Sequence, residues 1–237
     1  MTTYNLDIAN DKDDLTLRAS ELLVKTINSS LNKKDRIQIA LSGGSTPSSV
    51  YKILSKIEIP WNRVDVFLGD ERWVDSSNDS SNSLMIKNTL LSNPPGSKAC
   101  FHLVPTTDLS SPEESAEYFE RILNQKCIGS PPIFDLILLG LGEDGHTASL
   151  FPYSESLDVT DKWATVGRGK GQDRITLTFP VFCAAKKIVF LVSGSSKQNA
   201  LQRLLDPSEP SRRTPAKLVK PSSQIIVLAD KNASVLL

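Results

Sequence analysis

The residues best suited to chemistry gather in one short stretch of the chain. Glu143, Asp144 and His146 stand among three glycines, directly after an apolar run from Ile133 to Leu139. Such a run, broken only by Asp135, is typical of a strand buried on both faces of a sheet. An imidazole beside a carboxylate can act as a general base near neutral pH. We therefore predict that His146 is catalytic and that a carboxylate orients its ring.

Two carboxylates are candidates for this orienting role. Asp144 is close to His146 in sequence, whereas Asp70 lies in a second polar turn, residues 69–72, after a strand predicted over residues 63–68. In this second turn Arg72 offers a guanidinium that can hold an anion. The alternative interpretation of the turn is a surface ion-pair cluster of little energetic value. The sequence leaves the choice between Asp144 and Asp70 open.

Two further turns have the composition of anion-binding loops. Residues 42–47 combine two glycines with three hydroxyls before a predicted helix, and residues 193–197 end in a lysine before another. Free backbone N–H groups and the helix dipole favour a phosphate at such positions. No Gly-Lys-Ser/Thr follows the first loop, so it is not a Walker loop. We predict that a phosphate binds to Lys197 and to the loop residues Ser42, Gly43, Gly44, Ser45 and Thr46.

Several other chemistries are disfavoured. Gly140, Gly142 and Gly145 have the spacing of a dinucleotide fingerprint, but Pro152 follows too soon for the long helix that the fingerprint must open. No Gly-x-Ser-x-Gly is present, which argues against a serine hydrolase. With two histidines and no closely paired cysteines, we predict no metal site, and we interpret His102 as structural.

The composition is that of an ordinary globular protein. Of 237 residues, 39% are hydrophobic, and Lys plus Arg equal Asp plus Glu at 27 each, so no overall charge attracts nucleic acid or an anionic membrane. Three cysteines without CxxC spacing indicate reduced thiols. Neither a signal sequence nor a long apolar window is found. We expect a cytoplasmic protein, a monomer or weak homodimer, without nucleic-acid or membrane partners.

Strands and helices alternate along the chain. Helices are expected at residues 14–31, 48–56, 111–127 and 198–205, and strands at residues 36–41, 63–68, 101–104, 133–139, 187–192 and 224–229. A further pair of strands, 163–166 and 174–179, flanks a turn at residues 167–171. This alternation predicts a mostly parallel α/β sheet covered on both sides, in which ligands bind beyond the carboxyl ends of the strands. No composition break divides the chain, so we expect a single domain over residues 1–237.

Several motifs together carry a family resemblance. They are Leu-Ser-Gly-Gly-Ser-Thr-Pro at 41–47, Gly-Asp-Glu-Arg at 69–72, Ser-Asn-Ser-Leu-Met at 81–85, Leu-Gly-Leu-Gly-Glu-Asp-Gly-His-Thr-Ala-Ser-Leu-Phe-Pro at 139–152 and Arg-Ile-Thr-Leu-Thr at 174–178. The chain resembles the 6-phosphogluconolactonases of the glucosamine-6-phosphate isomerase/6-phosphogluconolactonase family. The resemblance implies a Rossmann-like three-layer α/β/α fold, shared with glucosamine-6-phosphate deaminases and ribose-5-phosphate isomerases.

The resemblance also implies an activity. It is the hydrolysis of 6-phospho-D-glucono-1,5-lactone to 6-phospho-D-gluconate, the second step of the oxidative pentose phosphate pathway, with no metal or organic cofactor. His146 would take a proton from the attacking water. Backbone N–H groups of the glycine turn, Gly142 among them, would face the oxyanion. Arg72 would help hold the phosphate, with Arg174 and Arg168 as further candidates.

Two alternatives remain beside the lactonase. A deaminase/isomerase of the same fold would carry a Glu at the position of Phe151 and a Tyr at that of Arg72, so both positions favour the lactonase. A catalytically silent sugar-phosphate binder is the other alternative. The chain also departs from the resemblance at residues 169–173, where Gly-Lys-Gly-Gln-Asp replaces an expected Lys-Pro-Pro run.

Overall fold

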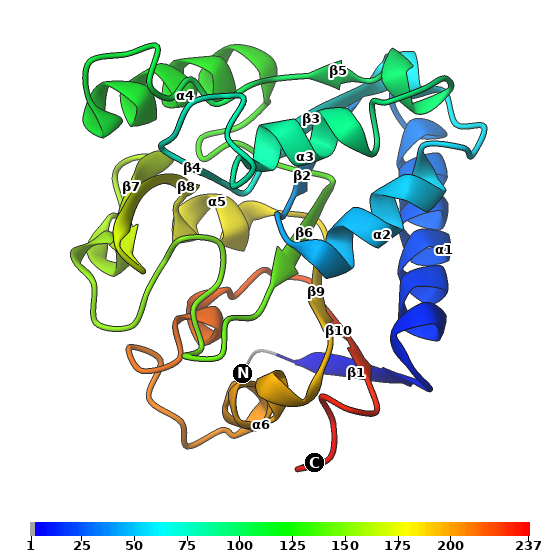
Figure 1. Ribbon diagram of the computed structural model, residues 1–237, viewed down its shortest axis with the longest axis vertical. Helices are drawn as coiled ribbons and strands as arrows, with labels where there is room; N and C mark the ends of the chain where they lie inside the picture. Colours follow the sequence, from blue (N-terminus) through cyan, green and yellow to red (C-terminus); the bar gives the residue numbers. More distant parts are fainter. Residues whose placement is uncertain (1–2) are drawn as a thin grey trace.

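A seven-stranded parallel sheet runs through the centre of the computed structural model, which describes residues 3–237 (Figure 1). The strands lie in the order β1-β10-β9-β6-β2-β3-β5. Their bounds are β1 Tyr4–Ala9, β2 Ile37–Leu41, β3 Val64–Leu68, β5 Cys100–Phe101, β6 Leu136–Gly140, β9 Ile188–Val192 and β10 Ile225–Asp230. Every residue of β2, β3 and β9 is buried, as the continuous apolar runs predict for strands covered on both faces.

The helices cover the sheet in two layers. Their bounds are α1 Lys12–Leu31, α2 Ser45–Leu54, α3 Asn82–Asn88, α4 Pro112–Lys126, α5 Phe179–Ala184 and α6 Gln198–Leu205. The connections through α1 and α2 step along the sheet in one direction, and those through α4 and α6 step in the other. Because such crossovers are right-handed, the two pairs of helices lie on opposite faces. This gives the predicted three-layer arrangement.

Local sequence signals explain where the helices begin. The side chain of Asp11 accepts hydrogen bonds from the backbone N–H groups of Asp13 and Asp14 at the start of α1. Ser111 caps α4 in the same way by accepting from the N–H of Glu114, and Pro112 follows at the first helical position. The predicted start of α4 is thus confirmed, whereas α2 begins three residues before its predicted start, at Ser45.

A small antiparallel sheet lies beside the main one and was only half predicted. It has the order β4-β8-β7, with β4 Asp70–Arg72, β7 Ala164–Gly169 and β8 Gln172–Leu177 (Figure 1). The hairpin β7–β8 was expected, but its turn is shorter than residues 167–171. Lys170 and Gly171 both have positive φ, which is typical of two-residue hairpin turns whose twist matches that of the strands. The flanking residues Gly169 and Gln172 therefore still pair with each other in the ladder.

Three further elements differ from the sequence prediction. Strand β1 was missed because it is a half-exposed edge strand, paired only with β10, in a polar segment. The predicted strand at residues 101–104 is reduced to Cys100–Phe101. Helix α5 stands where the end of a strand was expected, and it starts at Phe179 after Thr178.

The direction of the chain reverses between β2 and β6, which are neighbours in the sheet. From β2 the chain continues outward to β3 and β5, and from β6 it continues the other way to β9 and β10. Ligands of open α/β sheets bind in the crevice at such a switch point. The loops at residues 42–47 and 140–146 follow these two strands directly. Within residues 3–237, no helix is both long enough and apolar enough to cross a bilayer.

Candidate active site

A cavity of about 250 Å³ lies beyond the carboxyl ends of β2 and β6. It is lined by Ser42, Gly43, Gly44, Asp70, Arg72, Asn82, Gly140, Leu141, Gly142, His146, Ala148, Lys170, Arg174 and Lys197. Most of the residues that the sequence predicted for the site are therefore brought together. Three of them, Ser45, Thr46 and Asp144, do not line the cavity. Ser45 and Thr46 form the first turn of α2 beside it.

Asp144 holds the ring of His146. Its Oδ1 lies 2.5 Å from His146 Nδ1 and also accepts the backbone N–H of His146 at 3.1 Å. Burial tends to raise the pKa of Asp144, but the hydrogen bond and charge of His146, with a smaller contribution from Lys170, hold it well below its usual range. The carboxylate is thus ionised. Because Nδ1 donates to it in the neutral ring, Nε2 is left with the lone pair of a base.

Asp70, the other carboxylate considered, has a different partner. Its Oδ2 accepts a hydrogen bond from Ser149 Oγ at 2.5 Å, and Arg174 Nη1 lies 3.9 Å away. Asp70 is buried, and no hydrogen bond joins it to His146 among the residues that the structure describes. The contacts of the histidine therefore distinguish the two candidates, and Asp144 is the carboxylate that orients it.

Gly142 makes room for the histidine pair. A Cβ at this position would lie 2.0 Å from His146 Nδ1 and 2.7 Å from Asp144 Oδ1, so no larger residue fits without displacing them. Its N–H donates to the carbonyl of His146 at 2.8 Å, and the N–H of Gly145 donates to the carbonyl of Gly142 at 2.9 Å. The Gly142 N–H, which was expected to face an oxyanion, is therefore already used inside the turn, and so is the N–H of Gly145. The glycine turn shapes the site and does not offer these N–H groups to a ligand.

The loop after β2 offers free donors instead. Within residues 3–237, no protein acceptor pairs with the backbone N–H of Gly43 or Gly44, and the buried Oγ of Ser42 also lacks a partner. The Ser42 carbonyl is fixed by the hydroxyl of Tyr51 at 2.8 Å. These unpaired groups stand at the amino end of α2, where the dipole attracts an anion.

Two arginines face each other across the small sheet. Arg72 of β4 pairs in register with Arg174 of β8, and Nε of each is buried without a hydrogen-bond partner. Burial lowers the pKa of Arg174, the charge of Asp70 opposes that shift, and Arg72 adds to it. Like charges directly opposite each other destabilise a ladder. An anion bound between the two guanidinium groups would replace this repulsion by attraction to both.

Four cationic side chains and one carboxylate line the cavity, namely Arg72, Lys170, Arg174 and Lys197 with Asp70. Lys197 Nζ also lies 3.8 Å from Glu143 Oε1. Its loop is fixed by Asp230, which accepts the hydroxyl of Ser193 at 2.6 Å and the N–H of Gly194 at 3.1 Å. This excess of positive charge favours an anion in the cavity.

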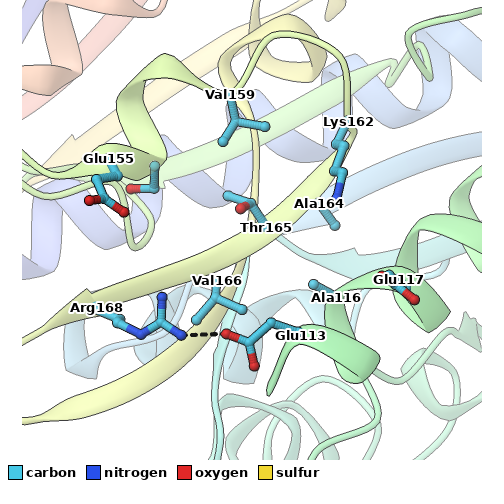
Figure 2. A pocket seen from close by; sticks show the side chains of 11 residues that line it. Glu113, Ala116, Glu117, Glu155, Val159, Lys162, Ala164, Thr165, Val166 and Arg168 are labelled. Atoms are coloured by element: carbon cyan, nitrogen blue, oxygen red, sulfur yellow. Dashed lines mark hydrogen bonds and ion pairs between the residues drawn. The ribbon is translucent and has the colours of Figure 1, made fainter. Parts of the chain in front are cut away.

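Lys170 was missed by the sequence reasoning, which considered Arg168 in the same turn. Arg168 instead pairs with Glu113 of α4, and both residues line a second cavity of about 240 Å³ (Figure 2). Arg168 and Lys170 are two residues apart, so strand alternation alone would place them on the same side. Lys170 instead stands in the two-residue turn with positive φ, outside the alternating strand, and from there its side chain lines the cavity. The departure at residues 169–173, including Lys170, was the available signal.

Asn82 was also missed as a site residue. It stands at the start of α3, where its Nδ2 donates to the carbonyl of Asp70 at 2.8 Å. A Cβ on Gly43 would lie 1.9 Å from Asn82 Oδ1, so the two residues are in close contact. Glu71 fixes this arrangement by accepting the N–H groups of Asn82 and Ser83, each at 2.7 Å.

The interpretation of residues 69–72 as a surface ion-pair cluster is therefore wrong. Glu71 is 1% exposed, and its carboxylate is satisfied by the amino end of α3 and the hydroxyl of Ser81. Asp70 and Arg72 alternate with Glu71 along β4 and face the cavity. Strand β4 thus supplies the carboxylate of Glu71, which caps α3, and the side chains of Asp70 and Arg72, which line the cavity.

Phe151 closes one side of the histidine. The ring centroids of Phe151 and His146 are 4.7 Å apart, and the guanidinium carbon of Arg174 lies 5.5 Å from the Phe151 ring. A Cβ on Gly169 would lie 2.5 Å from the same ring, which explains the glycine in β7. An apolar wall, and no second acid, therefore flanks His146 at this position.

The fold places the protein among the doubly wound α/β proteins, and the charge of the cavity points to a small anion as its ligand. Comparison with known proteins agrees with this class. The family model for glucosamine-6-phosphate isomerases/6-phosphogluconolactonase matches residues 10–228. The chain belongs to this family.

Several relatives match over nearly the full chain. The 6-phosphogluconolactonases of Synechocystis sp. and Nostoc sp. are 39% and 36% identical to it over 231 residues, covering 96% of each chain. The solved 6-phosphogluconolactonase of Trypanosoma brucei is 25% identical, with a TM-score of 0.87 over 100% of both chains. A monomeric glucosamine-6-phosphate deaminase shares the fold at 19% identity and a TM-score of 0.80, covering 99% of this chain and 100% of its own.

Proposed function

We propose that the protein hydrolyses 6-phospho-D-glucono-1,5-lactone to 6-phospho-D-gluconate. The observation that carries the proposal is the Asp144–His146 pair at the edge of a cavity lined by four cations. The lactone is an activated ester, so a positioned water and a base suffice for its hydrolysis. The names of the relatives described above support this substrate.

The proposed reaction uses His146 twice. Nε2 accepts a proton as water attacks the lactone carbonyl, and Asp144 stabilises the imidazolium that forms. When the tetrahedral intermediate collapses, the ring oxygen leaves with its electron pair and takes the proton back from His146. The new carboxylic acid then ionises in water. This sequence returns the neutral ring for the next cycle.

The phosphate of the substrate is proposed to bind among Ser42, the N–H groups of Gly43 and Gly44 and the amino end of α2. Lys197 and Arg72 supply compensating charge. The buried, unpaired Oγ of Ser42 and the free N–H groups support this assignment. Lys170 and Arg174 remain to balance negative charge that develops on the reacting carbonyl.

The active form is proposed to be a monomer or a weak homodimer. Site residues come from positions 42 to 197 and from both sheets, which supports one catalytic domain. A monomer in solution with full activity is the expected result of size-exclusion chromatography coupled to an assay.

A deaminase/isomerase is the second candidate, and Phe151 opposes it. That position lies against His146 and carries no acid that could open a sugar ring. The test offers purified protein the lactone and, separately, glucosamine 6-phosphate, and follows acid and ammonia release. We expect acid release far above the spontaneous rate and no ammonia. Ammonia release would favour the deaminase, and spontaneous rates with both substrates would indicate a silent binder.

A further inference from the structure

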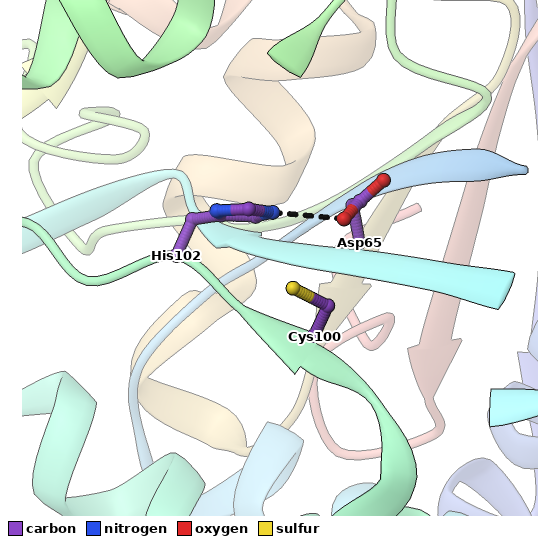
Figure 3. Close-up of side chains that lie close together, drawn as sticks. All are labelled: Asp65, Cys100 and His102. Carbon is purple, nitrogen blue, oxygen red and sulfur yellow. Dashed lines mark hydrogen bonds and ion pairs between the residues drawn. The ribbon is translucent and has the colours of Figure 1, made fainter. Parts of the chain in front are cut away.

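Three potential metal ligands converge at an edge of the main sheet, away from the cavity. Asp65 comes from β3, and Cys100 and His102 come from β5 and the residues that follow it (Figure 3). A carboxylate oxygen, the thiol sulfur and an imidazole nitrogen all lie within 4.8 Å of one another. The proposed reaction uses none of them.

Strand pairing brings these side chains to one face. Asp65 and Cys100 are direct partners in the parallel register of β3 and β5. Beyond β5, the N–H of His102 still donates to the carbonyl of Val66 at 2.9 Å, so the segment stays extended. Residues two apart in an extended chain face the same side. Cys100 and His102 therefore both face the side of Asp65.

Neighbouring groups fix the buried Asp65 and the half-buried His102. Arg36 Nε and Gln38 Nε2 lie 2.6 Å and 3.3 Å from Asp65 Oδ2, which leaves Oδ1 to face His102 Nε2 at 2.8 Å. The ring of His102 stacks on Phe67 with centroids 4.5 Å apart. Such outer contacts orient a carboxylate and an imidazole toward a metal.

The ligand types and the geometry of the cluster suit zinc. Asp65 Oδ2 forms an ion pair with Arg36 Nε at 2.6 Å, as expected for a carboxylate. A carboxylate, a thiolate and a neutral imidazole match the ligand types of Zn²⁺, and with the Arg36 guanidinium that pairs with Asp65 the occupied site carries a net charge of about +1. With ordinary zinc bond lengths, the donor atoms of a tetrahedron are about 3.3–3.6 Å apart. Asp65 Oδ1 and His102 Nε2 need to separate by only roughly 0.5 Å to reach this spacing.

We propose that Asp65 Oδ1, Cys100 Sγ and His102 Nε2 bind one Zn²⁺ ion, with water as the fourth ligand. Cys100 is exposed, which gives the ion a path from solvent. On binding, the thiol proton passes to solvent and the imidazole proton moves from Nε2 to Nδ1. Strand β5 pairs with β3 through only two residues, so the ion would tie this short edge strand to the sheet.

Cobalt(II) titration of the full-length protein tests the site, because Co²⁺ reports a thiolate ligand by a near-ultraviolet charge-transfer band. We expect one equivalent to bind with this band and Zn²⁺ to displace it. Cys100→Ser should abolish the band and weaken Zn²⁺ binding, measured against a chelator, by more than tenfold. The matched control Cys183→Ser should keep both, because Cys183 lies elsewhere, against Leu218 and Lys220.

Two outcomes would overturn the site: wild-type protein that binds Co²⁺ without a thiolate band, or a Cys100→Ser variant that retains it. His146→Gln, which should keep the band, separates this site from the catalytic histidine, since no cysteine lines the active cavity. Far-UV circular dichroism checks that each variant is folded. Lactone hydrolysis by Cys100→Ser should equal that of the wild type, so the two proposals can fail separately.

Discussion

Replacing Gly142 by alanine is expected to disable the catalytic pair while leaving the fold intact. The added methyl carbon would lie 2.0 Å from His146 Nδ1, 2.2 Å from its Cε1 and 2.7 Å from Asp144 Oδ1. Non-bonded carbon contacts are normally about 3.5–4.0 Å. The imidazole must therefore move by more than about 1 Å, and the 2.5 Å contact between Nδ1 and Asp144 cannot persist.

A displacement of about 1 Å in a catalytic group can cost roughly 100-fold in rate. We expect kcat for lactone hydrolysis to fall by about this factor, with KM changed little because the loop at residues 42–47, proposed to bind the phosphate, is untouched. Initial rates of acid release at several lactone concentrations, corrected for spontaneous hydrolysis, separate kcat from KM.

Gly69→Ala is the matched control for this experiment. A Cβ at Gly69 has no neighbour closer than Leu41 O at 3.8 Å, which is ordinary contact. This variant should keep wild-type kinetics. If Gly142→Ala also retained wild-type kcat, or if it lost activity only by unfolding in a thermal melt, the assigned role of the turn would be refuted.

Three other changes have distinct signatures. Arg72→Met should raise KM for the lactone by about 10- to 100-fold, which corresponds to the loss of a charge-assisted hydrogen bond, and should change kcat less. An unchanged KM would show that Arg72 does not bind the phosphate. Asp144→Asn should flatten the acid side of the stability curve. The pKa of Asp144 is lower in the folded than in the unfolded state, so its contribution to folding stability is present above the unfolded-state pKa and is lost as pH falls through the folded-state pKa. Urea melts of wild type and variant from neutral pH downward measure this loss. Identical stability curves for the two proteins would contradict the prediction. Gly169→Ala should lower stability by about 1–3 kcal/mol through overlap with the Phe151 ring, and an unchanged melting temperature would show that the ring can move freely.

Much of the main sheet could be predicted from the sequence, because strands buried on both faces leave continuous apolar runs. The runs before residues 42, 69, 140 and 193 each became a parallel strand followed by a polar turn. The Ser111 cap and Pro112 likewise predicted the start of α4. These are local signals, and each is complete within a few residues.

What the sequence could not predict depends on pairing between distant segments. Strand register and turn type decide which carboxylate, Asp144 or Asp70, contacts the histidine. They also place Asn82 against Gly43 and bring Lys170 to the cavity. A single sequence shows which side chains alternate along a strand, but it does not show which residues of two strands pair with each other.

The cluster of Asp65, Cys100 and His102 is a further example of this limit. His102 was interpreted as structural because it lies within an apolar segment that was predicted to be a strand. The ladder between β3 and β5 supplies Asp65 from 37 positions away.

The most direct test of the account is the rate of lactone hydrolysis by His146→Gln, measured with inorganic phosphate binding on the same sample. We predict a loss of about 10²–10⁴-fold in kcat, the usual contribution of a general base, with phosphate affinity retained because the cations of the cavity are unchanged. Wild-type turnover by this variant would contradict the central claim that His146 is the base.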